Sequence, residues 1–220
     1  MLEYAPNATT SFDATRPGSS RNSDASLLQS LRLGTRDAHG ALEAQPLVSG
    51  LLDPTLSPDR YVQLLQAFAA FYRRLEPRLS AALDHWHSRF PSVYRYRPRL
   101  PLLQADLADL GCDFLPEPGG EVPVNVTIET VPGVLYVLEG ATQGGRVIGP
   151  RLHRALGLSG HWGARYFNLH GQLDSWSHFR DWLSRIEPHL DQNATLSGAR
   201  ATFSGLHAHL DHWQVEQSDR

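Results

Sequence analysis

Two groups of residues in this sequence could do chemistry, and they stand about a hundred positions apart. The first group combines two cations, an imidazole and a carboxylate at helical spacing: Arg32, Arg36, His39 and Glu43. At 100° per residue, a helix would bring all four within about 60° of one another. An imidazole can bind a metal, and a guanidinium presents planar donors that suit a carboxylate. The simpler interpretation is a solvated helix face, because the chain has 11 histidines and a helical ion pair contributes only about 0.3 kcal/mol.

The second group is a run of glycines that follows an apolar stretch, within TVPGVLYVLEGATQGGRVIG at residues 130–149. Thr130 is a candidate N-cap and Pro132 suits a first helical turn, so the pattern predicts a helix. The glycines that follow are Gly140, Gly144, Gly145 and Gly149. Each glycine inside a helix costs about 1 kcal/mol relative to alanine, and close approach of another group to the backbone is the usual reason for one. Gly140 and Gly144 share a helix face. The same bare surface is expected to include Ala141, Gly145 and Ile148.

Three interpretations of this run can be compared. Small residues could let two helices pack closely. A phosphate-binding loop is excluded, because GATQGG lacks the Lys-Ser/Thr pair that holds phosphates and Mg²⁺. The third interpretation is a flexible helix that lies across a flat ligand such as a porphyrin. The glycine pattern alone is compatible with the first and the third.

Composition excludes several classes of protein. The chain has 220 residues, 41% of them apolar, which fits one domain with a sizeable core. A formal charge of −3 and a pI near 6.4 argue against a general nucleic-acid or anionic-membrane binder. No apolar run approaches the ~20 residues that span a bilayer, and the first residues lack the apolar core of a signal peptide. The single cysteine, Cys112, excludes an internal disulfide and a multi-cysteine metal site. We therefore expect a cytoplasmic protein.

The elements that must position the two groups are all predicted to be helical. Residues 1–24 are rich in small polar residues and predict a disordered leader, 25–213 predict one helical domain, and 214–220 a flexible tail. Helices or short helical turns are predicted at 26–44, 57–88, 99–110, 130–157, 161–171, 175–190 and 193–212. Pro77 and Pro150 are expected to kink the helices that contain them. Nothing alternates with a period of two, so the fold class is all-α, a single-domain bundle of seven to nine helices.

Two separated motifs resemble those of the heme oxygenase family, most closely the bacterial branch that supplies biliverdin to bacteriophytochromes. One is LRLGTRDAHGALE in the first predicted helix, and the other is LYVLEGATQGGRVIG in the glycine-bearing helix. A weaker third match is ARYFNLHGQLDSWSHFR, and the whole resemblance covers about residues 27–210. It implies a helical bundle in which heme b lies between the first helix and a glycine-rich, kinked distal helix.

The resemblance implies a role for each residue of the first group. His39 stands where the family places the proximal ligand of the heme iron. Glu43 stands where a carboxylate often follows, so it could hydrogen-bond the second ring nitrogen of His39. Arg32 and Arg36 match cations that meet the heme propionates in relatives, and Arg180 falls near another propionate-binding position.

On the other face of the heme, the resemblance assigns the oxygen side to Gly140, Gly144 and Gly145. Without side chains there, backbone amides and carbonyls could approach bound oxygen and leave room for water. Mammalian-type members carry an acid directly after the first distal glycine, whereas this chain has Ala141. Several bacterial relatives also lack that acid, and in them backbone groups hold the water. Gly140, Ala141 and Gly144 are therefore the candidate catalytic positions.

The implied reaction uses O₂ and an external electron donor, such as a ferredoxin or a reductase, to open the heme at a meso carbon. The products would be biliverdin, CO and ferrous iron, so heme would be substrate as well as cofactor. A bacteriophytochrome is the implied recipient of the bilin, and no nucleic acid or membrane is expected as a partner.

Two other functions fit parts of the sequence. One is a heme-storage or heme-sensing protein on the same fold, which Ala141 favours. The other is an all-α enzyme of the related thiaminase-like architecture, which would need an acid–thiol pair, and Cys112 has no obvious partner. If His39 is not the iron ligand, His153 and His170 are the next candidates.

Overall fold

The computed structural model describes residues 26–89, 94–112, 124–172 and 174–218. The predicted leader, residues 1–24, and most of the predicted loop between 112 and 127 lie outside the described residues. The described parts contain helices and no strand, which confirms the all-α prediction. The helices are α1 (Leu27–Gly34), α2 (Arg36–Ala44), α3 (Pro46–Ser49), η1 (Gly50–Leu52), α4 (Pro58–Arg89), α5 (Leu100–Asp109), α6 (Val131–Leu156), η2 (Tyr166–Asn168), α7 (Leu169–Gln172), α8 (Ser175–Ile186), η3 (Glu187–His189) and α9 (Gln192–Ser218).

The first predicted helix is present but interrupted. It forms α1 and α2, with Thr35 between them at a φ of −114° and a ψ of 2°. The Thr35 hydroxyl is buried and donates to the carbonyl of Leu31 at 2.7 Å, so the side chain takes part in the interruption. The prediction of one unbroken helix over 26–44 was wrong at this residue, where the hydroxyl bonds back to the i−4 carbonyl, a contact that often bends helices, although the amide bonds of Thr35 to Leu31 and of His39 to Thr35 are kept.

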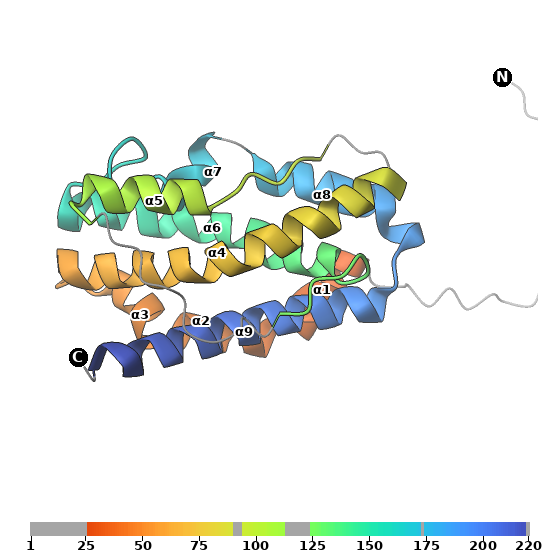
Figure 1. Ribbon diagram of the computed structural model, residues 1–220, viewed down its shortest axis with the longest axis horizontal. Coiled ribbons are helices and arrows are strands. Elements are labelled where there is room, and N and C mark those ends of the chain that lie inside the picture. Colours follow the sequence, from red (N-terminus) through yellow and green to blue (C-terminus); the bar gives the residue numbers. More distant parts are fainter. Residues whose placement is uncertain (1–25, 90–93, 113–123, 173, 219–220) are drawn as a thin grey trace, which may run out of the picture.

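The long aromatic helix is continuous. α4 begins at Pro58, as predicted, and continues through Pro77 to Arg89. In Figure 1 its second half rises away from the line of its first half. Tyr61, Phe71 and Leu75 have no solvent exposure, so the predicted aromatic face of α4 forms the core.

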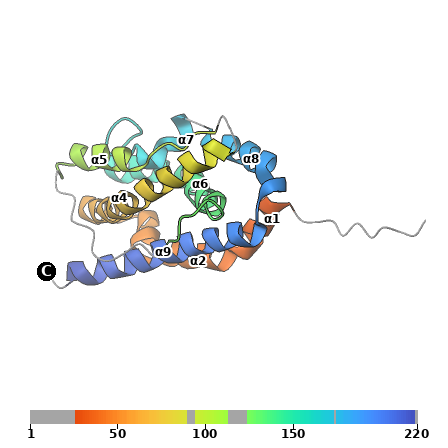
Figure 2. The same ribbon diagram turned by 45° about the vertical axis from the view of Figure 1, so that its right-hand side comes forward.

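α6 is the central helix of the bundle. It is flanked by α4, α8 and α9, and Figure 2 views it nearly end-on among them. Thr130 is its N-cap residue and it ends before Gly157, whose φ of 71° is left-handed, so both predicted boundaries are confirmed. Like α4, it continues through its internal proline, Pro150.

Near its start, α6 touches α9 backbone to backbone. A Cβ atom built on Gly133 would collide with the carbonyl oxygen of Thr195 and lie 2.7 Å from the amide nitrogen of Ala199. A Cβ on Gly198 would lie 2.5 Å from the carbonyl oxygen of Thr130. Close packing through small residues therefore occurs in this chain, but at the start of α6 rather than at Gly140 and Gly144.

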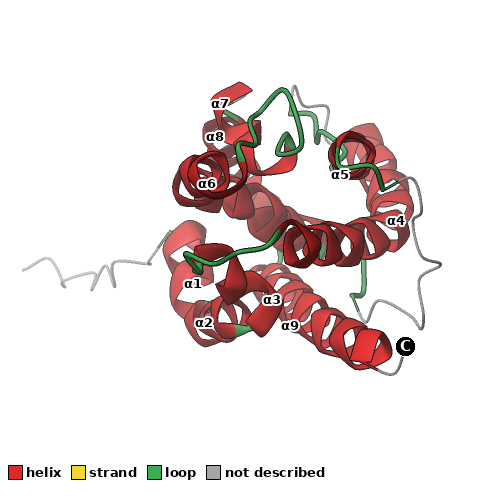
Figure 3. Cartoon of the chain, turned by 90° about the vertical axis from the view of Figure 1, so that its left-hand side faces the viewer, coloured by secondary structure: helices red, strands yellow, loops and turns green. Residues whose placement is uncertain are grey.

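The remaining elements complete a layered bundle. In Figure 3, α1, α2, α3 and α9 form one group and α6, α7 and α8 another. The side chain of Asp174 caps α8 by accepting from the amide of Ser177, as predicted. α9 continues to Ser218, so the flexible tail predicted from residue 214 is corrected for residues 214–218. Among the described residues, no helix is long and apolar enough to cross a membrane.

Candidate heme-binding site

His39 lies on the surface of α2 with a carboxylate beside it. Its side chain is 54% exposed, and its Nδ1 atom is 3.4 Å from Oε2 of Glu43, one helical turn further on. The edge of its ring meets Phe203 of α9, at a centroid distance of 5.5 Å and an interplanar angle of 80°. With Nδ1 directed to the carboxylate, Nε2 is the nitrogen that can bind iron.

α9 holds the helix pair that carries His39. α2 itself has no buried residue, although Ala38 and Leu42 pack partly buried against the core. At the junction of α1 and α2, the Gly34 carbonyl accepts from Nε of Arg200 at 2.7 Å. A Cβ on Gly34 would lie 2.7 Å from Leu196, so the absence of a side chain also lets α9 approach closely. The contacts of α9 therefore position the imidazole.

The three predicted propionate-binding arginines are on the surface. Arg32 and Arg36 are both exposed, on either side of the Thr35 interruption, and neither forms an ion pair with another described residue. Arg180 is exposed on α8, where its guanidinium donates to the hydroxyl of Ser177 at 3.0 Å. All three guanidinium groups are accessible to an anionic ligand.

A Cβ built on Gly140 or Gly144 would meet side-chain atoms only, at ordinary van der Waals distance. The nearest atom to a Cβ built on Gly144 is Cδ1 of Ile148, on the same helix, at 3.8 Å. For Gly140 the nearest atom is Cζ3 of Trp176, in ordinary van der Waals contact at 3.7 Å. Ala141, between them, is exposed. No backbone of another described element covers this face, as the interpretation of close approach by a ligand requires.

Gly145 and Gly149 serve a different purpose. A Cβ on Gly145 would collide with the carbonyl oxygen of Phe167 and lie 2.8 Å from Nδ1 of His170. A Cβ on Gly149 would lie 2.8 Å from the side chain of Asn168. Both glycines let η2 and α7 pack on α6. The prediction that Gly145 extends the bare surface was wrong, because consecutive helical residues point about 100° apart.

The two alternative ligands lie away from the bare face. His170 is half-buried against Gly145; burial lowers the pKa of its imidazole, and the positive charge of Arg146 lowers it further. His153 lies in the last turn of α6, with Nδ1 3.2 Å from the carbonyl of Leu158. Neither ring comes within 4 Å of a Cβ built on Gly140 or Gly144.

Two aromatic residues next to the site were missed by sequence reasoning. Trp176 touches the Gly140 position and packs against Tyr136 and Phe179 at centroid distances of 6.0 and 5.7 Å. Its place within a weakly matching motif, one turn before Arg180, was a usable signal. Phe203 had none, because it is separated from His39 by most of the chain.

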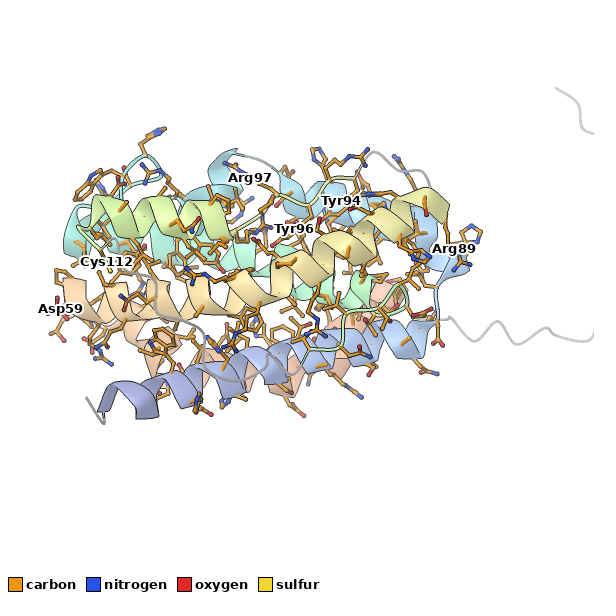
Figure 4. The ribbon with its side chains drawn as sticks, in the orientation of Figure 1. Asp59, Arg89, Tyr94, Tyr96, Arg97 and Cys112 are labelled. Carbon is orange, nitrogen blue, oxygen red and sulfur yellow. The ribbon has the colours of Figure 1, made fainter. Side chains whose placement is uncertain are left out.

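Glu139, directly before the bare glycines, belongs to a buried polar cluster. Its side chain and that of Arg99 are each only 1% exposed, and Nη2 of Arg99 donates to Oε2 of Glu139 at 2.8 Å. The Tyr94 hydroxyl donates to Oε1 at 2.8 Å. Tyr94 belongs to the segment between α4 and α5 that Figure 4 labels together with Tyr96. Burial raises the pKa of Tyr94 and the Glu139 carboxylate raises it further, so the phenol remains a donor.

The donor set fits a heme. It offers one imidazole supported by a carboxylate, three exposed guanidinium groups for anionic substituents, and a stretch of helix without side chains. The described fold is all-α, and these groups are of the kinds that a heme would require.

The family follows from comparison with known proteins. The family model for heme oxygenase matches residues 25–113. A heme oxygenase of Xanthomonas campestris pv. campestris (strain 8004) is 30% identical over 158 residues, which are 70% of this chain and 91% of that protein. The chain therefore belongs to the heme oxygenase family and is a heme-degrading oxidoreductase, as the two sequence motifs predicted.

Two solved structures share the fold. Heme oxygenase from Neisseria meningitidis, determined with NO and CO bound, aligns with a TM-score of 0.65 at 20% identity, over 85% of this chain and 91% of that one. Heme oxygenase from Leptospira interrogans aligns with a TM-score of 0.66 at 19% identity, over 86% of this chain and all of that one.

Proposed function

We propose that this protein opens heme at a meso carbon to give biliverdin, CO and ferrous iron, using O₂ and an external electron donor. Two observations support the proposal: the imidazole of His39 has a carboxylate beside it, and the backbone at Gly140 and Gly144 meets no backbone of another described element. When bound, heme supplies the iron that activates O₂ and the meso carbon that is attacked.

On the proximal side, α2 provides the ligand and its orientation. Nδ1–H of His39 donates a hydrogen bond to Glu43, which presents Nε2 to the iron and increases the basicity of the ring. Arg32 and Arg36, from the same helix pair, bind the propionates, with Arg180 of α8 as a third cation. One helix pair would therefore fix both the iron and one edge of the macrocycle. That placement would determine which meso carbon lies next to the bound oxygen.

On the distal side, the chain offers backbone rather than an acid. Ala141 has no proton to give, and the carboxylate of Glu139 is engaged with Arg99 and Tyr94. We infer that amides and carbonyls around Gly140 and Gly144 hold the water that delivers protons. Glycine also lets the helix bend to admit substrate and release product.

One spectrum tests the reaction. Purified protein with hemin and ascorbate, or with a ferredoxin and its reductase, should lose its Soret band in air and gain the absorbance of a bilin. A Soret band that persists with reductant and O₂ present would instead indicate a heme-storage or heme-sensing protein. The thiaminase-like alternative would need an acid beside the thiol, whereas Sγ of Cys112 accepts from the side-chain amide of Gln66 at 3.1 Å.

We further propose that the bilin goes to a bacteriophytochrome and that the reaction takes place in the cytoplasm. The motif resemblance to biliverdin-supplying bacterial members supports this recipient. The test is to add an apo-bacteriophytochrome to the turnover mixture and follow the red-light absorbance of its chromophore adduct. No adduct in a mixture that does form bilin would reject the recipient and leave the reaction intact.

A further inference from the structure

α6 receives no support from the backbone of another described element at Gly140 and Gly144, the segment that the proposed site uses. Gly140 and Gly144 lower the intrinsic stability of the helix, and their open face receives no brace from another backbone. The front of this segment is thus left for the ligand. Any support that fixes its position must come from the sides or the back.

Glu139 supplies such a support. It directly precedes Gly140, and its side chain points about 100° around the helix from the open face. Its carboxylate is held by Arg99 and Tyr94, both at 2.8 Å. Its carbonyl also accepts from the hydroxyl of Thr142 at 2.6 Å. Side chain and backbone of this one residue are therefore both fixed.

The residues that hold Glu139 are themselves anchored to another helix. Glu76 of α4 accepts from the amides of Arg99 and Leu100 and from the hydroxyl of Tyr96. Arg99 also donates to the carbonyl of Arg97 at 2.8 Å. A continuous path of hydrogen bonds thus runs from the core helix α4, through the segment 94–100, to the residue before Gly140.

The buried Arg99–Glu139 ion pair would be unexpected here if its only role were to stabilise the fold. Burying two charges carries a large desolvation cost, and well-packed apolar side chains of similar size are often at least as stable. An apolar contact tolerates sliding and rotation, whereas hydrogen bonds to a guanidinium fix direction as well as distance. Although burial alone would lower the pKa of Arg99, Tyr96 and Glu139 raise it above its usual value, so the guanidinium stays charged.

We propose that Glu139 is a positioning residue for heme opening: its buried pair with Arg99 sets the height and rotation of the Gly140–Gly144 backbone over the heme. This inference rests on the proposed function for its consequence, the choice of meso carbon. The hydrogen bonds that hold Glu139 are present in the protein without heme.

The first test therefore uses the heme-free protein. Amide hydrogen exchange is measured over residues 140–148 in wild type, in Glu139→Gln, and in the triple variant Glu139→Leu/Arg99→Met/Tyr94→Phe, which replaces the whole cluster by apolar groups. We expect exchange in 140–148 to rise at least tenfold in both variants. In the triple variant the denaturation midpoint should return close to the wild-type value while the fast exchange persists.

A matched control separates bracing from general stability. Asp106 is also a fully buried acid, paired with Arg165 at 3.1 Å, but it holds the backbone amides of Arg165 and Tyr166. Asp106→Asn should speed exchange at 165–168 and leave 140–144 unchanged, because a Cβ on Gly140 or Gly144 would not meet that segment. Wild-type exchange at 140–148 in the triple variant would overturn the proposal. So would an equal rise throughout α4 in Glu139→Gln, because the pair would then contribute only to overall stability.

The second test follows heme orientation and product. In the ferric cyanide complex, the heme-methyl proton resonances should change from one dominant pattern to two or more in the triple variant, and the ratio of bilin isomers should shift at least threefold. Unchanged resonances and an unchanged ratio would overturn the positioning role. If the wild type binds heme without opening it, the proposed function fails, while the exchange and resonance results still decide the role of Glu139.

Discussion

The start and the middle of α6 use glycine for opposite purposes. At Gly133 a missing side chain lets α9 press directly on the backbone, whereas at Gly144 it leaves the backbone facing open space. Gly145, the very next residue, again belongs to the packed kind. What separates the two kinds is therefore the surface opposite each glycine and not the local sequence. Packed glycines should matter for folding, and open ones for ligand binding.

Adding a methyl group at Gly133, where α9 packs on the backbone, should cause the largest loss of stability. In Gly133→Ala the new Cβ would collide with the Thr195 carbonyl, so α6 and α9 must move apart. We expect a loss of about 3 kcal/mol in the free energy of unfolding, measured by urea denaturation. Gly144→Ala is the matched variant and should be neutral or stabilising by up to about 1 kcal/mol. Similar losses in the two variants would remove the distinction between packed and open glycines.

A bulky side chain at Gly144 should have the opposite effect, with little change in stability and a large loss of hemin binding. Gly144→Leu should keep its free energy of unfolding within about 1 kcal/mol of wild type, because the nearest atom is a flexible isoleucine end. Hemin affinity should fall at least tenfold, which is about 1.4 kcal/mol, and bilin formation should be lost. Both are followed by absorbance during titration and turnover. Normal turnover would show that heme does not lie against this backbone.

Replacing His39 should affect heme binding and leave the stability of the fold almost unchanged. His39→Ala removes a half-exposed ring, so stability should change by no more than about 0.5 kcal/mol, while the spectrum of an imidazole-bound heme and most activity disappear. His207 is a close control, because it also has an acid one turn later, Asp211 at 3.0 Å. His207→Ala should leave the heme spectrum unchanged. An unchanged spectrum in His39→Ala would move the ligand to His153 or His170.

Local signals predicted much of the molecule, and the failures share one cause. Pro58, Thr130 and Gly157 mark helix boundaries through their own backbone chemistry, so the sequence identified them. The contact of His39 with Glu43 was likewise predictable, because the two residues are one helical turn apart. In contrast, the contact of Phe203 with His39, and the surface that separates Gly145 from Gly144, depend on which distant elements meet. Periodicity within a segment carries no information about that meeting.

The cations beside the proximal residue should have a smaller effect. Arg32→Ala or Arg36→Ala should weaken hemin binding about three- to tenfold, because an exposed ion pair contributes at most about 1 kcal/mol. The loss should shrink in high salt. Arg154→Ala, an exposed arginine at the end of α6, is the control and should change nothing. Affinity and isomer ratio that stay at wild-type values in both variants would favour the solvated-face interpretation.

The smallest expected effect concerns His170, on the packed side of α6. Burial, and then the charge of Arg146, lower the pKa of its imidazole in the folded protein. The unfolded chain therefore takes up this proton first as the pH falls below about 6.5, and the native state loses stability over that range. Solvent screening at a half-buried ring keeps the effect below about 0.5 kcal/mol. Urea midpoints at pH 7.5 and 5.5 should therefore differ less in His170→Gln than in wild type. An equal difference in both proteins would show that the pKa of His170 is the same in the folded and the unfolded chain.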